Sequence, residues 1–183
     1  MRNVVLVLCF ASMACSRPEP LEVLSSVPEF TLTAESGKEF RSSQLAGSVW
    51  VANFIFTNCM GPCPRMTGQM RQVQNAVSDF KDVRLVSFTV DPARDTPQVL
   101  ADYARRNKAD TAQWSFLTGP QETLHQLKRN AFLLGDVSGQ LEHSTRFALV
   151  DRRGRIRAFY DTTEPGAVKR VIRDMERLRE EKS

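Results

Sequence analysis

The sequence has little of what marks several large classes of protein. Only 4 cysteines occur in 183 residues, which is too few for a disulfide-stabilised scaffold in a chain of this length. No apolar run approaches the roughly 20 residues that a spanning helix needs, and this excludes a multispan membrane protein. Basic residues exceed acidic ones only by 25 to 21, and they are scattered. A dedicated nucleic-acid-binding protein is therefore not expected.

The composition is that of an ordinary globular protein. Hydrophobic residues make up 42% of the chain and charged residues 25%, which argues against wholesale disorder, collagen and coiled coil. A chain of 183 residues has room for one globular domain and little else. It contains no internal repeat and no low-complexity tract.

The first fifteen residues have the organisation of an export signal. Arg2 precedes an apolar stretch over residues 4–11, and small residues follow before Cys15. A cysteine at the cleavage position resembles a bacterial lipoprotein signal, in which Cys15 becomes the lipidated first residue. Ser12 stands where such signals usually have Leu, so an ordinary signal peptide or an uncleaved single anchor is the alternative.

These features divide the chain into three parts. We expect a signal peptide over residues 1–14, a short tether over 15–27 and one domain over 28–183. The protein would be exported and held by a lipid anchor on the periplasmic or another extracytoplasmic face of a membrane. Such compartments are oxidising. The two cysteines of the domain, Cys59 and Cys63, would therefore be in an oxidising environment.

Strand-like and helix-like segments alternate along the domain. A turn at Gly37 joins two short strands into an N-terminal hairpin. Residues 49–56 form a nearly unbroken apolar run, as in a strand buried on both faces, and residues 64–80 have helical apolar spacing. The further elements are expected as a strand at 84–90, a helix from 96, a strand at 116–117, a helix at 120–131, a hairpin of 147–150 and 156–160, and a helix from 165. This order predicts an α/β protein with a central mixed sheet covered on both faces, as in the thioredoxin-like fold.

Two cysteines lie between the first long strand and the helix that follows it. Cys59 and Cys63 are four positions apart, so they fall on the same side of a first helical turn, with β-carbons roughly 5–6 Å apart. The positive end of the helix dipole and exposed N–H groups favour the thiolate there, which predicts a lowered thiol pKa. The pair could close into a disulfide or offer two soft ligands to a metal ion. The spacing alone does not choose between these.

A histidine in a later loop adds a third donor. His143 directly precedes the strand expected at 147–150, and in a thioredoxin-like fold this loop approaches the cysteine turn. Two thiolates and one imidazole make a three-coordinate soft site that suits Cu(I), whereas Zn(II) needs a fourth ligand. The alternative is a loop histidine bonded to backbone groups. The other histidine, His125, is expected on the exposed side of its helix without a ligand role.

Three separated motifs follow one another along the chain. They are Phe56-Thr57-x-Cys59-x-x-x-Cys63-Pro64, Thr89-Val90-Asp91-Pro92-x-Arg94-Asp95-Thr96-Pro97 and His143-Ser144-Thr145. Together they resemble the SCO/SenC family of copper chaperones, and the resemblance extends from residue 28 to the last helix.

This resemblance implies a thioredoxin-like fold, membrane tethering, and copper bound by Cys59, Cys63 and His143, as Cu(I) and also as Cu(II). It implies delivery of copper, or thiol reduction, for assembly of the CuA centre of cytochrome c oxidase. The partner would be the oxidase subunit that carries CuA, or another exported copper or thiol protein. Asp91 would be a nearby carboxylate that supports the site.

The chain departs from the family pattern directly after the first cysteine. Members commonly have Pro and an acidic residue there, whereas this chain has Met60 and Gly61. Gly61 loosens the turn, and Met60 either adds a thioether to the metal or faces solvent. We expect metal ligation to survive this change, which bears instead on the choice of partner.

Two functions remain open at this point. The first is a copper metallochaperone, and the second is a thiol–disulfide oxidoreductase that cycles Cys59 and Cys63 on an exported partner. Oxidoreductases of this fold typically place two residues between their cysteines, and this chain places three. That spacing, together with His143, favours copper.

Overall fold

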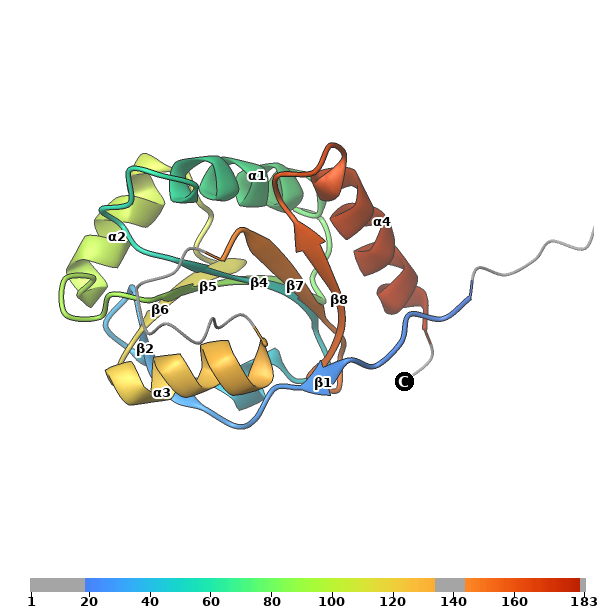
Figure 1. Cartoon of the computed structure of the whole chain (residues 1–183), viewed down its shortest axis with the longest axis horizontal. Coiled ribbons are helices and arrows are strands. Elements are labelled where there is room, and N and C mark those ends of the chain that lie inside the picture. The colour runs from blue at the N-terminus through green and yellow to red at the C-terminus, as the bar shows by residue number, and fades with distance from the viewer. Residues whose placement is uncertain (1–18, 134–143, 182–183) are drawn as a thin grey trace, which may run out of the picture.

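The structure, a computed structural model, describes residues 19–133 and 144–181. Within these ranges eight strands form one sheet, and helices lie on both of its faces (Figure 1). The strands are β1 (Ser25–Ser26), β2 (Thr31–Ala34), β3 (Glu39–Arg41), β4 (Val49–Ile55), β5 (Val83–Thr89), β6 (Trp114–Thr118), β7 (Arg146–Val150) and β8 (Arg155–Asp161). The helices are α1 (Cys63–Ala76), α2 (Pro97–Arg106), α3 (Gln121–Gln126) and α4 (Ala167–Glu180), with a 3-10 turn η1 (Ser42–Leu45) and a π-helical turn η2 (Leu127–Ala131).

Three parallel strands form the centre of the sheet. β4 pairs with β5 from Val49 to Ile55, and β5 pairs with β6 in the same direction. β7, β8 and β1 continue the sheet antiparallel on one side, and β2 and β3 do so beyond β6. All seven residues of β4 are buried, as its apolar run predicts for a central strand covered on both faces.

Side chains that alternate along each strand fill two apolar layers. Val51 and Ile55 of β4 pack in the layer under α1, α2 and α4, whereas Trp50 and Phe54 pack in the layer next to α3. Figure 1 shows these helices on opposite faces of the sheet. Because neighbouring residues of a strand point to opposite faces, β4 contributes to both layers. The predicted mixed sheet, covered on both faces, is confirmed.

The strands define two ends of the sheet. β4 runs toward the loop that contains the cysteines, and we call this the cysteine end. The start of β4 lies beside the end of β7, where Trp50 pairs with Val150, and the β7–β8 turn follows there. The last turns of α4 and the strand β1 lie on this second side of the molecule (Figure 1), which we call the tether end.

Several elements end at other residues than the apolar spacing predicts. α1 ends at Ala76, four residues before the predicted end at residue 80, and the N–H of Phe80 donates to the carbonyl of Val77 in a turn. Val77 is nevertheless fully buried. The apolar spacing therefore predicted the burial of Val77 correctly, but it did not distinguish the helix from the turn that follows it. The helix expected over 120–131 is α-helical only to Gln126 and then becomes η2.

The N-terminal segment contributes a strand to the sheet. Within the range expected as a tether, Ser25 and Ser26 of β1 pair with the start of β8. The signal peptide expected over residues 1–14 and the lipidation site at Cys15 lie outside the described residues. In the part of the chain that the structure describes, no helix combines the length and apolar character needed to cross a membrane.

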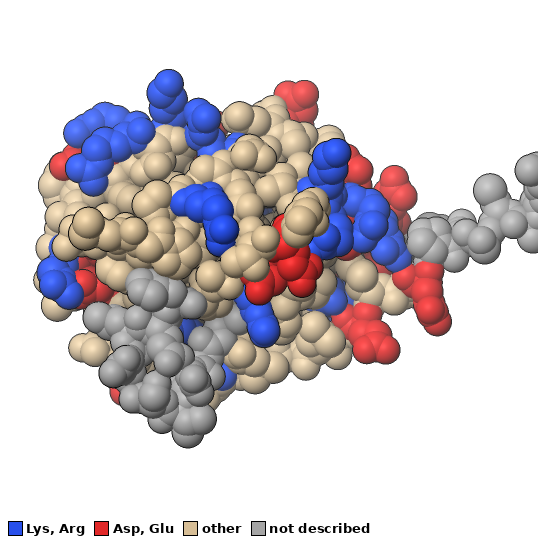
Figure 2. Space-filling view, turned by 45° about the horizontal axis from the view of Figure 1, so that its top comes forward, with Lys and Arg blue, Asp and Glu red and all other residues tan. Residues whose placement is uncertain are grey.

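Basic side chains do not gather into one patch on the face that carries α1, α2 and α4. Figure 2 shows lysine and arginine spread over this face, with acidic side chains close to many of them. Near α4, Asp174 pairs with both Arg173 and Arg177. This pairing agrees with the scattered charge of the sequence.

Candidate functional site

The two cysteines lie where β4 passes into α1. β4 ends at Ile55, a loop carries Cys59, and Cys63 is the first residue of α1. Pro62 occupies the N-cap position and Pro64 the first turn, where a missing N–H costs little. The N–H of Met66 donates to the carbonyl of Pro62 at 3.0 Å. The helix therefore begins at the second cysteine, and Cys59 lies in the preceding loop and not in the first helical turn that the four-residue spacing predicted for both cysteines.

Both cysteine side chains are nearly buried, with 7% of Cys59 and 3% of Cys63 exposed. They are thiols and not the halves of a disulfide, and Cys59 is a close enough neighbour to change the pKa of Cys63. They belong to the same apolar layer as Ile55 and Met66. The two thiols therefore share one apolar environment that is shielded from bulk water.

The environment of Cys63 reverses the expected effect of the helix start. Burial raises the pKa of the Cys63 thiol well above its ordinary value, and the neighbouring Cys59 thiol raises it further, although a backbone hydrogen bond with Phe56 acts in the opposite direction. The predicted lowering of the thiol pKa is therefore wrong for Cys63. Desolvation of a buried thiolate outweighs the favourable field of the helix terminus.

A buried carboxylate, Asp95, holds the start of the cysteine loop. Thr57 donates its N–H to Asp95 Oδ2 at 3.2 Å and its hydroxyl to Oδ1 at 2.5 Å. The hydroxyl of Thr89, the last residue of β5, donates to Oδ2 at 2.5 Å. Only 1% of Asp95 is exposed. Because hydrogen bonds to a carboxylate are among the stronger ones, Asp95 fixes the cysteine loop against the end of β5.

Asp91 belongs to the turn that presents Asp95. Its carboxylate accepts a hydrogen bond from Arg94 Nε at 2.5 Å, and its carbonyl accepts the N–H groups of Arg94 and Asp95. The N–H of Asp91 donates to Thr89 Oγ1 at 2.9 Å. These contacts give Asp91 an indirect link to the cysteine loop through Asp95. Direct support of a metal by Asp91 stays a prediction.

A tyrosine from α2 lies beneath the cysteines. Tyr103 is buried in the same layer, and its hydroxyl is 2.7 Å from the hydroxyl of Thr67 on α1. Burial raises the pKa of the Tyr103 phenol, and negative charge on Cys63, Cys59 or Asp95 would raise it further. The hydrogen bond therefore joins two neutral hydroxyls and ties α2 to the first half of α1.

Sequence reasoning missed the parts that Asp95 and Tyr103 have in this site. The sequence indicated Asp95 only as a member of the second motif, and no motif contains Tyr103. The contact between Asp95 and Thr57 spans 38 positions, and that between Tyr103 and Thr67 spans 36. Thr57 belongs to the first motif and Asp95 to the second. Their membership of motifs was the signal that could have suggested a contact between them.

The two residues that depart from the family pattern have simple surroundings. Met60 is 99% exposed, so its thioether faces solvent. Gly61 is not one of the glycines with a left-handed backbone, and a β-carbon added there would lie 3.8 Å from Cys59 Sγ, an ordinary contact distance. Met66 and Met70 are fully buried in the core, in agreement with a packing role.

The third predicted ligand, His143, lies outside the described residues. Within residues 19–133 and 144–181, no group of three or more His, Cys, Asp or Glu side chains is arranged to hold a metal ion. The structure therefore brings Cys59 and Cys63 together, and the participation of His143 stays a prediction. His125 lies half-buried on α3, on the opposite face of the sheet from α1.

A mixed sheet with a cysteine pair at the junction of a central strand and a helix defines a thioredoxin-like protein with a dithiol site. The family model described as SCO1/SenC matches residues 19–180. The chain therefore belongs to the SCO1/SenC family, and its thioredoxin-like fold is confirmed.

Known proteins of similar sequence and structure carry Sco names. The SCO1 protein homolog of Bacillus subtilis is 32% identical over 94% of this chain and 91% of its own. A SCO1/SenC family lipoprotein from Bacillus anthracis superposes with a TM-score of 0.80 at 36% identity, covering 88% of this chain and all of that one.

Two further solved structures are described by what they bind or assemble. BsSco, described as a member of the Sco family of cytochrome c oxidase assembly proteins with a disulfide switch, superposes with a TM-score of 0.78 at 32% identity, covering 88% of this chain and 98% of that one. Yeast Sco1 with copper bound has the same fold, with a TM-score of 0.65 at 24% identity, covering 83% and 89%.

Proposed function

We propose that this protein is a copper metallochaperone that binds copper through Cys59, Cys63 and His143 and delivers it for assembly of the CuA centre of cytochrome c oxidase. The observation that carries the proposal is the pair of neighbouring buried thiols, Cys59 in the loop before α1 and Cys63 at its start. Membership of the SCO1/SenC family supports the oxidase as the destination, because BsSco is described as belonging to a family of oxidase assembly proteins.

The chemistry of the donors suits copper as cargo. Thiolate sulfur is a soft ligand, and it favours Cu(I) over the harder cations that carboxylates bind. Each thiol must lose its proton to coordinate, so copper enters as protons leave. The buried surroundings oppose an isolated thiolate at Cys63, and a bound cation compensates that charge. A neutral imidazole from His143 would complete a three-coordinate site, from which copper passes to a partner by exchange of ligands.

Titration of the fully reduced protein with Cu(I), in competition with a chelator, tests the ligand set. We expect one copper per chain, and we expect His143→Ala to weaken binding by at least about tenfold, the lower bound for loss of even an outer-shell partner. His125→Ala is the matched control, because this histidine lies on the opposite face of the sheet. Unchanged affinity and an unchanged absorption spectrum in His143→Ala would exclude the proposed ligand set.

A second function is favoured by the contact between the two thiols. In a thiol–disulfide exchange, one cysteine thiolate attacks a partner's disulfide and forms a mixed disulfide, and the other cysteine then displaces the partner. The partner gains two electrons and two protons as two thiols, and Cys59 and Cys63 form one S–S bond. This activity requires both cysteines but not the histidine. Reductase turnover that survives in His143→Ala and is lost in Cys63→Ser would identify it.

We further propose that the protein is exported and anchored to the membrane by a lipid on Cys15. The organisation of residues 1–15 supports this location, and the similar protein from Bacillus anthracis is described as a lipoprotein. Labelling with a radioactive fatty acid in the producing bacterium tests the anchor. We expect label on the wild type and none on Cys15→Ser, and equal labelling of both chains would disprove lipidation at this residue.

A further inference from the structure

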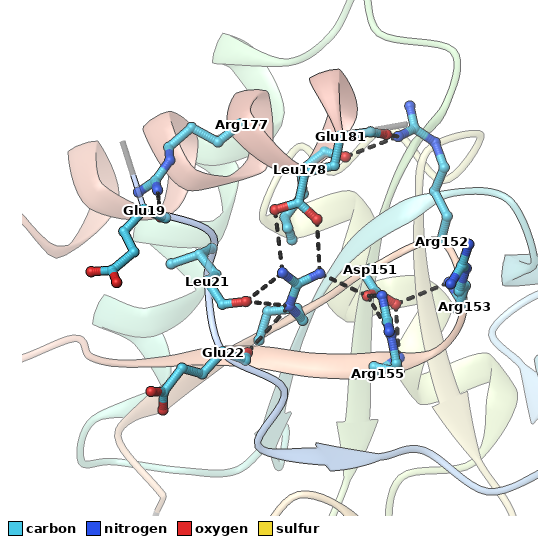
Figure 3. A network of polar contacts seen from close by, with 11 residues as sticks. Glu19, Leu21, Glu22, Asp151, Arg152, Arg153, Arg155, Arg177, Leu178 and Glu181 are labelled. Atoms are coloured by element: carbon cyan, nitrogen blue, oxygen red, sulfur yellow. Dashed lines mark hydrogen bonds and ion pairs between the residues drawn. The ribbon is translucent and has the colours of Figure 1, made fainter. Parts of the chain in front are cut away.

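The segment that follows the lipidation site is bound to the domain rather than extended away from it. The guanidinium of Arg157, on β8, donates hydrogen bonds to the carbonyls of Leu21 and Glu22, the second at 3.2 Å. The N–H of Leu24 donates to the carbonyl of Ile156 at 2.8 Å. Figure 3 shows Leu21 and Glu22 beside Asp151 and Glu181 in one polar network. The chain is thus held along β8 and the last turns of α4.

The bound segment begins close to Cys15. Arg177, in the last turn of α4, donates to the carbonyl of Glu19. Four Cα–Cα steps separate Cys15 from Glu19 in the sequence, and these span at most about 14 Å even when fully extended. A lipid on Cys15 would therefore hold the tether end of the domain against the bilayer surface. A long flexible tether would have left the orientation of the domain free.

Exposed apolar side chains gather at the same end. Of the four large apolar residues that are well exposed in the described ranges, Val23 is 51%, Leu24 is 45% and Leu133 is 55% exposed. Val23 and Leu24 directly precede β1. Leu133 lies two residues after Ala131, whose carbonyl accepts a hydrogen bond from Ser25 Oγ at 2.8 Å. Exposure of such side chains to water is unfavourable, and their transfer into the interfacial region of a bilayer lowers the free energy.

The cysteine loop lies on the other side of the molecule. β4 leads from the tether end toward the cysteine end, and its seven residues span roughly 20 Å at the usual rise per residue of a strand. In Figure 1 the start of α1 and the described N-terminal segment lie at opposite sides. The fourth exposed apolar residue, Met60, belongs to this distant loop.

We propose that the edge formed by Val23, Leu24 and Leu133 is a membrane-contacting surface. The lipid bilayer that holds the anchor is its occupant, and the docked segment sets the orientation of the domain so that Cys59 and Cys63 face away from the membrane. This inference rests on the proposed lipid anchor at Cys15. It goes beyond that anchor, because it assigns which face meets the lipid and which face meets the partner protein.

The test uses the full lipidated chain in phosphatidylcholine vesicles with and without brominated acyl chains, which quench tryptophan at the hydrocarbon boundary. Trp50 and Trp114 are buried, so their emission serves as a constant background. We expect Val23→Trp to lose its added emission in brominated vesicles. We expect the control Met60→Trp, which is even more exposed but lies in the cysteine loop, to keep its added emission.

The outcomes separate this inference from the proposal on which it rests. A chain that fails to float with the vesicles overturns both. A chain that floats while Val23→Trp is not quenched, or while Met60→Trp is quenched equally, overturns the orientation alone. Concentration-dependent dimerisation, measured by sedimentation, that shields the tryptophan of Val23→Trp from the brominated lipid also overturns the orientation. A second copy of the chain would then cover the apolar edge.

Discussion

The two ends of the sheet are held together by different kinds of interaction. At the tether end, arginines pair with carboxylates: Arg157 donates to Asp151 and to Glu181, each at 3.0 Å. At the cysteine end, Asp95 accepts its described hydrogen bonds from the hydroxyls of Thr57 and Thr89 and from a backbone N–H. The buried carboxylate Asp151 at the tether end is therefore bound by guanidinium groups, whereas the buried carboxylate Asp95 at the cysteine end is bound by neutral donors. The ion pair of the cysteine end, Arg94 with Asp91, has an exposed arginine.

The difference fits what each end has to do. The tether end must hold the segment before β1 and the last turn of α4, and guanidinium groups can bind several carbonyl and carboxylate oxygens at once. Near the thiols, a guanidinium would compete electrostatically with an incoming copper ion. Threonine hydroxyls hold Asp95, and through it the cysteine loop, without a guanidinium bonded to Asp95. Four variants or conditions test this comparison, in order of decreasing effect.

Removal of Arg157 should have the largest effect on stability. Its side chain is nearly buried and contacts the tether, Asp151 and Glu181. Because loss of one partner leaves buried charge uncompensated, we expect Arg157→Met to lower the free energy of unfolding by about 3 kcal/mol. Urea denaturation measures this value, and hydrogen exchange at Ser25 and Ser26 should accelerate with it. A loss below about 1 kcal/mol, as for an exposed ion pair, would contradict the assignment.

Removal of Asp95 should affect both stability and the site. Asp95→Ala leaves three donors of the cysteine loop and β5 without their acceptor, so we expect a loss of about 2 kcal/mol and weaker Cu(I) binding. The matched control is Asp102→Ala, because Asp102 is half-exposed on α2 and pairs with Arg105. Its effect should stay below about 0.5 kcal/mol. Equal copper affinity in Asp95→Ala and wild type would show that Asp95 does not position the thiols.

Acid should weaken the tether end. Burial alone would raise the pKa of Asp151, but hydrogen bonds from Arg155 and Arg157 outweigh it and lower the pKa below its usual value. A lowered folded-state pKa stabilises the protein above the unfolded value of about 4, and this stability is lost as the pH falls through the folded value. We expect the urea concentration at the unfolding midpoint to decrease as the pH is lowered below about 4. This decrease should be smaller in Asp151→Asn. An unchanged pH profile in Asp151→Asn would refute this account.

A methyl group at Gly61 should have the smallest effect. Its backbone is outside the left-handed region, and the added β-carbon would meet Cys59 Sγ at 3.8 Å. We expect Gly61→Ala to change stability and Cu(I) affinity by less than about 0.5 kcal/mol each. Gly37→Ala is the contrasting variant, because φ is +77° at Gly37, and it should cost about 1 kcal/mol. A large loss of copper binding in Gly61→Ala would mean that the cysteine loop must rearrange at this residue.

The order of strands and helices could be predicted because each element carries its own local pattern. The apolar run of β4 and the turn at Gly37 needed only neighbouring residues to be recognised, and the structure has both. The end of α1 could not be predicted from spacing, because Val77 is buried in a turn just as it would be in a helix. The pairing of β1 with β8 was not predicted either, because the two serines of β1 have no sequence pattern typical of a strand.

Motif spacing and periodicity are local properties, and they were enough to predict the family, the fold and the start of a helix close to Cys63. The burial of the thiols, and with it the raised rather than lowered pKa of Cys63, depends on tertiary packing. Tertiary packing also decided that Asp95 binds Thr57 and that Arg157 holds the segment before β1. Desolvation and long-range hydrogen bonds depend on which segments pack together, and no short stretch of sequence carries that information.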